Sequence, residues 1–158
     1  MPTSAATDLW DVLAGDAAAE SPLWAEALLP APERELRAIF SPLAPERFAL
    51  ALETIYEGYL VHYGRSRLFE PADEHEAVLL GDYLFAHGLV RVASLGETEA
   101  VAVLADLISH CAHLRAEGAA GDGEAWVEAA TRLRGSGDVE GVAAAAASAL
   151  LAHVDRFG

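Results

Sequence analysis

Two stretches decide the fold of this chain, Glu53-Thr-Ile-Tyr-Glu-Gly-Tyr-Leu-Val-His62 and Ala77-Val-Leu-Leu-Gly-Asp-Tyr-Leu-Phe-Ala86. Their apolar residues recur at intervals of three and four, which is the period of an α-helix. No sustained alternation of β-branched and aromatic residues is found in the sequence, so we expect no β-strand. The sequence therefore predicts an all-α protein, an antiparallel bundle of about seven or eight helices.

Proline, glycine and capping residues divide the chain into these helices. Ser21-Pro22 combines a capping side chain with a first-turn proline, and Asp73 is followed three positions later by Glu76, as in a capping box. Gly64 and Gly96 are placed to end helices. The predicted helices cover, in order, 7–15, 21–29, 32–40, 45–64, 73–92, 97–115, 124–133 and 139–153.

Length and composition indicate one helical domain. The chain has 158 residues, and 53% of them are hydrophobic, mainly alanine and leucine, which favour helices. We expect a single domain over 1–158, in which short N-terminal helices (1–44) precede core helices (45–116) and a C-terminal helix pair (119–158).

The charge of the chain excludes several functions. Its net charge is −15, which opposes nucleic-acid binding because phosphate contacts need clustered basic side chains. All ten basic residues are arginine, so no lysine nucleophile is available. The single cysteine, Cys111, rules out an intramolecular disulfide and favours a reducing, cytoplasmic location. The start of the chain does not resemble a signal peptide, and no apolar run is long enough to span a membrane.

Residues 53–67 resemble the first aspartate-rich motif of the trans-isoprenyl (polyprenyl) diphosphate synthases. Glu53 matches the family glutamate, Leu60-Val61 the apolar pair and His62 the histidine before the acidic residues. In the family, three aspartates then bind magnesium ions that hold the allylic diphosphate. The matching positions here are Tyr63, Gly64 and Arg67. A phenol, a glycine and a guanidinium cannot ligate magnesium, which prefers carboxylate oxygens.

The similarity continues in the next helix. Ala77 to Ala86, including Gly81-Asp82, is similar to the family helix Ala-Val-Leu-Ala-Gly-Asp-x-Leu-Leu-Ala, and Leu95-Gly96-Glu97 is similar to the turn after it. The resemblance covers roughly residues 48–116, and no second aspartate-rich motif follows. It implies a truncated isoprenyl synthase fold, a pseudoenzyme without catalytic residues, metal or cofactor.

In family members the helices after the first aspartate motif form the dimer interface. Independently, the helix from Val78 to Val92 is apolar nearly all round and must be covered on most sides. We therefore expect an accessory or structural subunit that contacts an active prenyl synthase, a larger complex or a second copy, with any membrane association peripheral and through the partner. The expected interface residues are Val78, Leu79, Tyr83, Phe85, Leu89 and Val92.

Two other functions remain open. The first is a binding module for a prenyl or quinone-like apolar ligand, in a relic of the active-site cavity lined by Tyr56, Tyr59, His62 and Asp82. The second is an enzyme of new chemistry around His62, His110 and Asp82. Glu53 and Glu57, one helical turn apart, are further candidates to face such a cavity.

Some polar and aromatic residues allow a structural or a functional interpretation. His110-Cys111-x-His113, with Asp106 one turn earlier, would need a fourth ligand such as His75 or Asp82 to bind zinc. This spacing matches no standard zinc motif, so we expect packing roles. A carboxylate at Asp82, in mid-helix among leucines, is expected to be hydrogen-bonded to a neighbouring helix. Core or interface anchors are expected at Trp10, Trp24 and Trp126.

Overall fold

The computed structural model describes residues 8–135 and 141–157. These residues form seven α-helices and three short 3₁₀-helices, and they contain no β-strand, only an isolated bridge between Leu28 and Phe69. The predicted all-α helix bundle is thus confirmed. In chain order the elements are α1 (Leu9–Glu20), α2 (Pro22–Ala27), η1 (Ala31–Glu33), η2 (Ser41–Leu43), η3 (Glu46–Phe48), α3 (Ala49–Tyr63), α4 (Glu74–Ala93), α5 (Thr98–Glu117), α6 (Asp122–Arg132) and α7 (Val142–Asp155).

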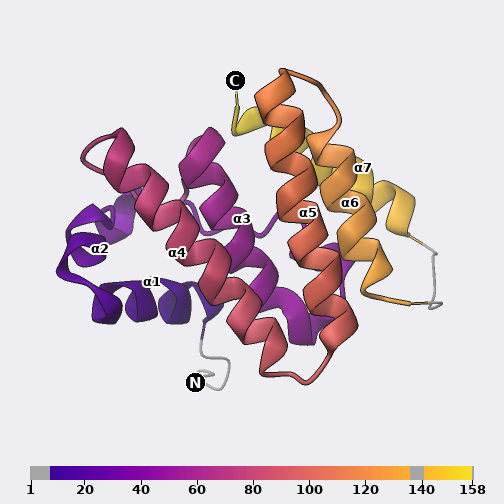
Figure 1. The fold of residues 1–158 in the computed structure, drawn as a ribbon, viewed down its shortest axis with the longest axis horizontal. Helices are drawn as coiled ribbons and strands as arrows, with labels where there is room; N and C mark the ends of the chain where they lie inside the picture. The colour runs from indigo at the N-terminus through magenta and orange to yellow at the C-terminus, as the bar shows by residue number, and fades with distance from the viewer. Residues whose placement is uncertain (1–7, 136–140, 158) are drawn as a thin grey trace.

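Helix α3 is the centre of the molecule. Every residue from Ala51 to Leu60 is buried, so this helix is surrounded on all sides. From α3 the chain adds neighbours in order: α4 packs on α3, α5 on α4, α6 on α5 and α7 on α6 (Figure 1). Helices α1 and α2 lie on the opposite side of α4 from α5 (Figure 1).

Two apolar clusters fill the bundle. The larger joins α3 to α5, α6 and α7 around Phe40, Tyr56 and Trp126. The smaller joins α1 and α2 to α4 around Trp10 and Trp24. The three tryptophans are 8%, 7% and 1% exposed in chain order, which confirms them as core anchors.

The predicted caps are formed where the structure describes them. The Ser21 hydroxyl accepts from the backbone N–H of Leu23 at 3.1 Å, and the Asp73 carboxylate accepts from that of Glu76 at 2.8 Å. Gly64 ends α3 as expected. At the N-terminus, Thr7 lies outside the described residues, and Asp8 caps an α1 that extends past the predicted end. Val139, the predicted start of the last helix, also lies outside them.

The helix predicted over 32–40 is wrong. Only η1 forms there, and two backbone N–H groups after it donate to distant parts of the chain instead of continuing a helix. The N–H of Glu35 donates to the carbonyl of Arg67 at 3.0 Å, and the N–H of Ile39 donates to the Glu53 carboxylate at 3.2 Å. Buried backbone groups need hydrogen-bond partners, and α3 offers the Glu53 carboxylate as one. These long-range hydrogen bonds stabilise an extended segment more than local helical hydrogen bonds would stabilise a helix.

Glycines allow α3 and α4 to approach closely. A Cβ at Gly88 would overlap the Ile55 side chain, and one at Gly58 would lie 2.9 Å from the carbonyl oxygen of Gly81. This contact fixes which side of α4 faces α3 and therefore which side remains outside. Across the described ranges, no helix has the length and apolar character needed to cross a membrane.

Candidate functional site

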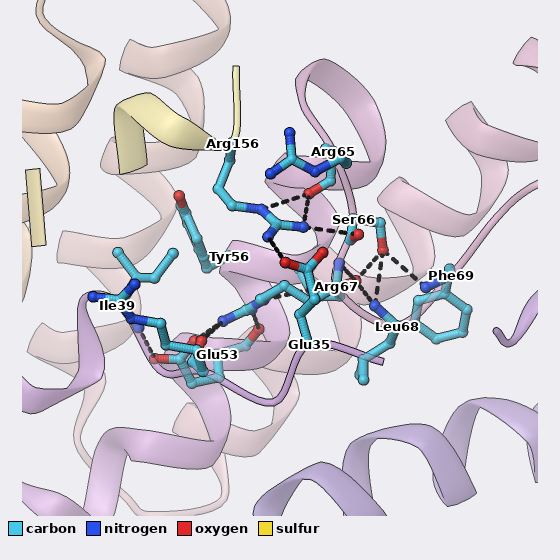
Figure 2. A network of polar contacts seen from close by, with 12 residues as sticks. Glu35, Ile39, Glu53, Tyr56, Arg65, Ser66, Arg67, Leu68, Phe69 and Arg156 are labelled. Atoms are coloured by element: carbon cyan, nitrogen blue, oxygen red, sulfur yellow. Dashed lines mark hydrogen bonds and ion pairs between the residues drawn. The ribbon is translucent and has the colours of Figure 1, made fainter. Parts of the chain in front are cut away.

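A buried ion network occupies the region where the resemblance places metal ligands (Figure 2). The Arg67 side chain is 0% exposed, and its guanidinium pairs with Glu53 at 2.6 Å and with Glu57 at 2.9 Å. Both carboxylates come from α3, one turn apart. The rings of Trp10 and Tyr56 lie 4.8 and 5.1 Å from the guanidinium carbon. Arg67 thus sits between two carboxylates and two aromatic faces.

Backbone donors complete this network. Glu53 accepts from the N–H groups of Ile39 and Ser41, both at 3.2 Å. Glu57 accepts from the N–H groups of Arg67 and Leu68, both at 3.0 Å, and from the Ser66 hydroxyl. Burial lowers the pKa of Arg67, but the attraction of Glu53 and Glu57 outweighs it and raises the pKa above its ordinary value. The carboxylates therefore belong to the core, not to a cavity.

The C-terminal end of the chain closes over the adjoining loop. Arg156 donates two hydrogen bonds to the carbonyl of Arg65, at 2.9 and 2.7 Å, and one to that of Ser66 at 2.9 Å (Figure 2). Gly64 faces the Phe157 ring so closely that a Cβ there would lie 2.7 Å from it. The segment 64–66 is thereby held by the C-terminal residues Arg156 and Phe157. No group of three or more His, Cys, Asp or Glu side chains suited to a metal is found in the described part of the chain.

A second polar network joins four helices at Asp122. One oxygen of this carboxylate accepts from the Tyr59 hydroxyl at 2.7 Å and from Arg115 at 2.6 Å, and it lies 3.1 Å from Nε2 of His153. Nδ1 of His153 lies 2.7 Å from the Tyr56 hydroxyl. Burial raises the pKa of Asp122, yet the hydrogen bonds from His153, Tyr59 and Arg115 prevail and hold it well below its ordinary value.

The order carboxylate, imidazole, phenol resembles a proton relay, but its geometry is structural. Both ring nitrogens of His153 are engaged, and Tyr56 is completely buried. Burial raises the pKa of Tyr56 and Tyr59, so both phenols stay protonated. A small cavity of about 220 Å³ reaches Asp122 and His153 from the surface, but it is not lined by either tyrosine. The network therefore serves to hold α3, α5, α6 and α7 together.

The four residues predicted to line a relic cavity do not meet in one. Tyr56 and Tyr59 are 0% and 1% exposed and pack against the Trp126 ring in the core. His62 instead pairs with Asp82 at 3.1 Å between α3 and α4, and the Asp82 side chain is 67% exposed. The prediction of a shared cavity is corrected, because the core aromatics fill the space beside the tyrosines. Asp82 does contact the neighbouring helix α3 through His62, but the expectation that it is a buried polar residue is wrong, because its side chain faces solvent.

His110, Cys111 and His113 point in different directions. Cys111 is buried, whereas the two histidines are exposed. Burial, followed by the charge of Asp122, raises the pKa of the Cys111 thiol to about 12, so it is unreactive. His110 lines a groove of about 370 Å³ between α5 and α6, away from the His62–Asp82 pair. Of the three residues of the proposed new chemistry, His62 and Asp82 are in contact, and His110 lies apart from them.

Helix α4 presents an apolar surface to solvent. We call Val78, Leu79, Asp82, Ala86 and Val90 the α4 face; all five are exposed and lie on one side of the helix at three- and four-residue spacing. Val78, Leu79 and Val90 are 51%, 57% and 61% exposed. Within this fully described helix, Asp82 is the one charged member of the face.

The predicted interface residues divide accordingly. Val78 and Leu79 belong to the α4 face, and Tyr83, Phe85 and Leu89 are half-buried along its edges. Val92 is corrected to a core residue, because it is 0% exposed beneath the helix.

The sequence matches no protein-family model, and neither a curated protein nor a solved structure is similar to it. The resemblance to isoprenyl synthases stays a prediction from the sequence motifs at 53–67, 77–86 and 95–97.

Proposed function

We propose that this protein is a non-catalytic, isoprenyl-synthase-like subunit that acts by binding another protein through the α4 face. The observation that carries this proposal is the exposure of Val78, Leu79 and Val90 on one side of a single helix. The face extends about 18 Å along the helix, given the rise of 1.5 Å per residue. Exposed apolar side chains gathered on one helix face are typical of protein contacts.

The state of the buried polar groups supports a non-catalytic role. Glu53 and Glu57 are neutralised by Arg67 in the core, and the loop beside them is held by Arg156. If the chain descends from a synthase, these contacts replace the site where magnesium and diphosphate would bind.

The partner in this proposal is an active prenyl synthase, a larger assembly or a second copy of the chain, in the cytoplasm. A prenyl or quinone-like ligand is the weaker alternative. Tyr56 and Tyr59 pack against Trp126, and the α5–α6 groove is lined by Asp106, Glu124 and Glu128. Carboxylates at these positions do not suit an apolar tail.

Affinity purification in mild detergent from the cells that make the protein, with mass spectrometry of co-eluting chains, tests the proposal. We expect a stoichiometric partner with the wild-type chain and its loss with Leu79→Glu or Val90→Glu. Leu151→Glu is the matched control, because Leu151 on α7 is 76% exposed and lies outside the α4 face. Recovery of a monomer alone, or equal loss with all three variants, would contradict the proposal.

A further inference from the structure

The charge at the middle of the α4 face indicates what kind of partner fits it. Asp82 lies between Val78 and Val90, and its side chain is 67% exposed. His62 contacts it at 3.1 Å from below, stacked on the Phe85 ring at 5.0 Å between centroids. Because His62 is only 12% exposed, a partner that covers the face meets the carboxylate before it meets the imidazole.

A carboxylate at the centre of an apolar contact restricts the partner. Covering Asp82 removes it from water, which is unfavourable unless a donor on the partner replaces the lost hydration. A lysine or arginine provides that donor as a charge-assisted hydrogen bond. A wholly apolar or acidic partner surface would replace none of this lost hydration and would leave the carboxylate dependent on its contact with the His62 ring.

The same charge disfavours a second copy as the occupant. If α4 of one copy packed on α4 of another about a two-fold axis, the two Asp82 side chains would approach each other in an interface from which water is excluded. Each chain also carries a net charge of −15. Next to the face, the first turn of α4 adds Glu74 and Glu76. Like charges directly across an interface are unfavourable, so these features select a partner of opposite sign.

We propose that the occupant of the α4 face is an apolar helix of another protein that carries a lysine or arginine opposite Asp82, with further basic residues toward the Glu74 end. This inference rests on the proposed function, since it names the partner class for the same surface. Apolar contacts with Val78, Leu79 and Val90 supply the affinity. The pair with Asp82 sets the orientation of the helix, and the net charge speeds association.

Two synthetic amphipathic 18-residue helices provide the test, one built from leucine and lysine and one from leucine and glutamate, with identical apolar faces. Binding of each labelled peptide to the full chain is followed by fluorescence anisotropy at physiological salt. We expect the leucine–lysine peptide to bind the wild-type chain. Asp82→Lys should weaken this binding about tenfold, and Leu79→Glu should abolish it. Asp106→Lys is the control, because it makes the same charge change in the α5–α6 groove and should have a far smaller effect.

The inference is overturned if the leucine–glutamate peptide binds equally well, or if Asp82→Lys weakens binding no more than Asp106→Lys does. Circular dichroism of each variant verifies that the fold is retained. The affinity purification, repeated with Leu79→Glu and Asp82→Lys, distinguishes failure of the partner class from failure of the proposed function. If Leu79→Glu still removes the cellular partner while Asp82→Lys has no specific effect, only the partner class is wrong. If Leu79→Glu retains that partner, the proposed function fails as well.

Discussion

At the scale of single residues, Arg67 has the most unusual environment in the described structure. A fully buried guanidinium is tolerated because two carboxylates and two aromatic rings surround it. Two kinds of change to this network differ in their effect on the free energy of unfolding. Replacing the whole network with apolar residues can be neutral, whereas removing one member leaves uncompensated charge in the core.

Replacing Arg67 with methionine should therefore destabilise the protein strongly. The variant leaves Glu53 and Glu57 buried without their cation, at a cost of about 3–5 kcal/mol in unfolding free energy. Urea unfolding followed by circular dichroism measures it. Arg65→Met is the control, because Arg65 is 51% exposed and lies 3.7 Å from Asp155, a pair worth about 1 kcal/mol or less. Equal stability of the two variants would contradict the role given to the network.

Asp122 gives a prediction about pH. Its pKa is lowered in the folded state, so its contribution to stability is fully present above its ordinary value of 3.8 and is lost as the pH falls toward the folded value. Asp122→Asn should cost about 1.5–3 kcal/mol at pH 5, and the difference from wild type should narrow by pH 3. Urea unfolding at both pH values tests this. A difference that stays constant, or widens in acid, would show that the carboxylate charge is not what stabilises the fold.

The positions of some of these residues could be predicted from the sequence, and those of others could not. The tryptophans and the Asp73 cap follow from local pattern. The spacing of Glu53 and Glu57 placed both on one face, but nothing local signals that Arg67, beyond a loop, turns inward to them. Asp122 and His153 are also far apart in sequence, and only the packing of α6 on α7 brings them together.

At the scale of elements, the α3–α4 pair controls what the molecule presents to solvent. Small residues at the crossing let the two backbones approach, which directs Leu80 and Leu84 inward and the α4 face outward. The helices of this pair were predictable because their apolar period is long and their caps are strong. The segment 32–40 was not, because its backbone partners lie on α3 and in the 67–70 loop.

Gly88→Ala and Gly15→Ala should have opposite effects. At Gly88 the added methyl overlaps Ile55, so we expect a loss of about 1–3 kcal/mol from overpacking. At Gly15, exposed in α1 with no atom within 4 Å of the added Cβ, alanine should stabilise by about 0.5–1 kcal/mol. Thermal and urea unfolding of both variants provide the comparison. If both variants changed the free energy of unfolding in the same direction by similar amounts, the close packing of α3 on α4 at Gly88 would be contradicted.

At the scale of the whole molecule, the interior is occupied by structural networks, and large apolar side chains are exposed on the α4 face and, at Leu151 and Val154, on α7. Helical class and the general location of the α4 face could be predicted from composition and from the apolar helix at 78–92. Which residues form the α4 face could not be predicted, because periodicity alone does not tell which side of an apolar helix meets the core. Val92 is the example: its type matches Val90, yet one is buried and the other exposed.

If the synthase chemistry is lost, ligands of the synthases should not stabilise the protein. A ligand that binds the native state raises the melting temperature, and the rise grows as the ligand concentration exceeds its Kd. We expect no shift with magnesium and a prenyl diphosphate, measured by differential scanning fluorimetry beside an active prenyl synthase as positive control. A magnesium-dependent rise in this protein would contradict the pseudoenzyme interpretation.

The central claim, that the protein acts through the α4 face, is tested most directly by site-specific photo-crosslinking in the cells that make it. A benzophenone side chain is placed at Leu79, at Val90 and, as a control, at Leu151. We predict that Leu79 and Val90 yield the same crosslinked partner protein and that Leu151 does not. No crosslink from the α4 face, or the same products from all three positions, would contradict the claim.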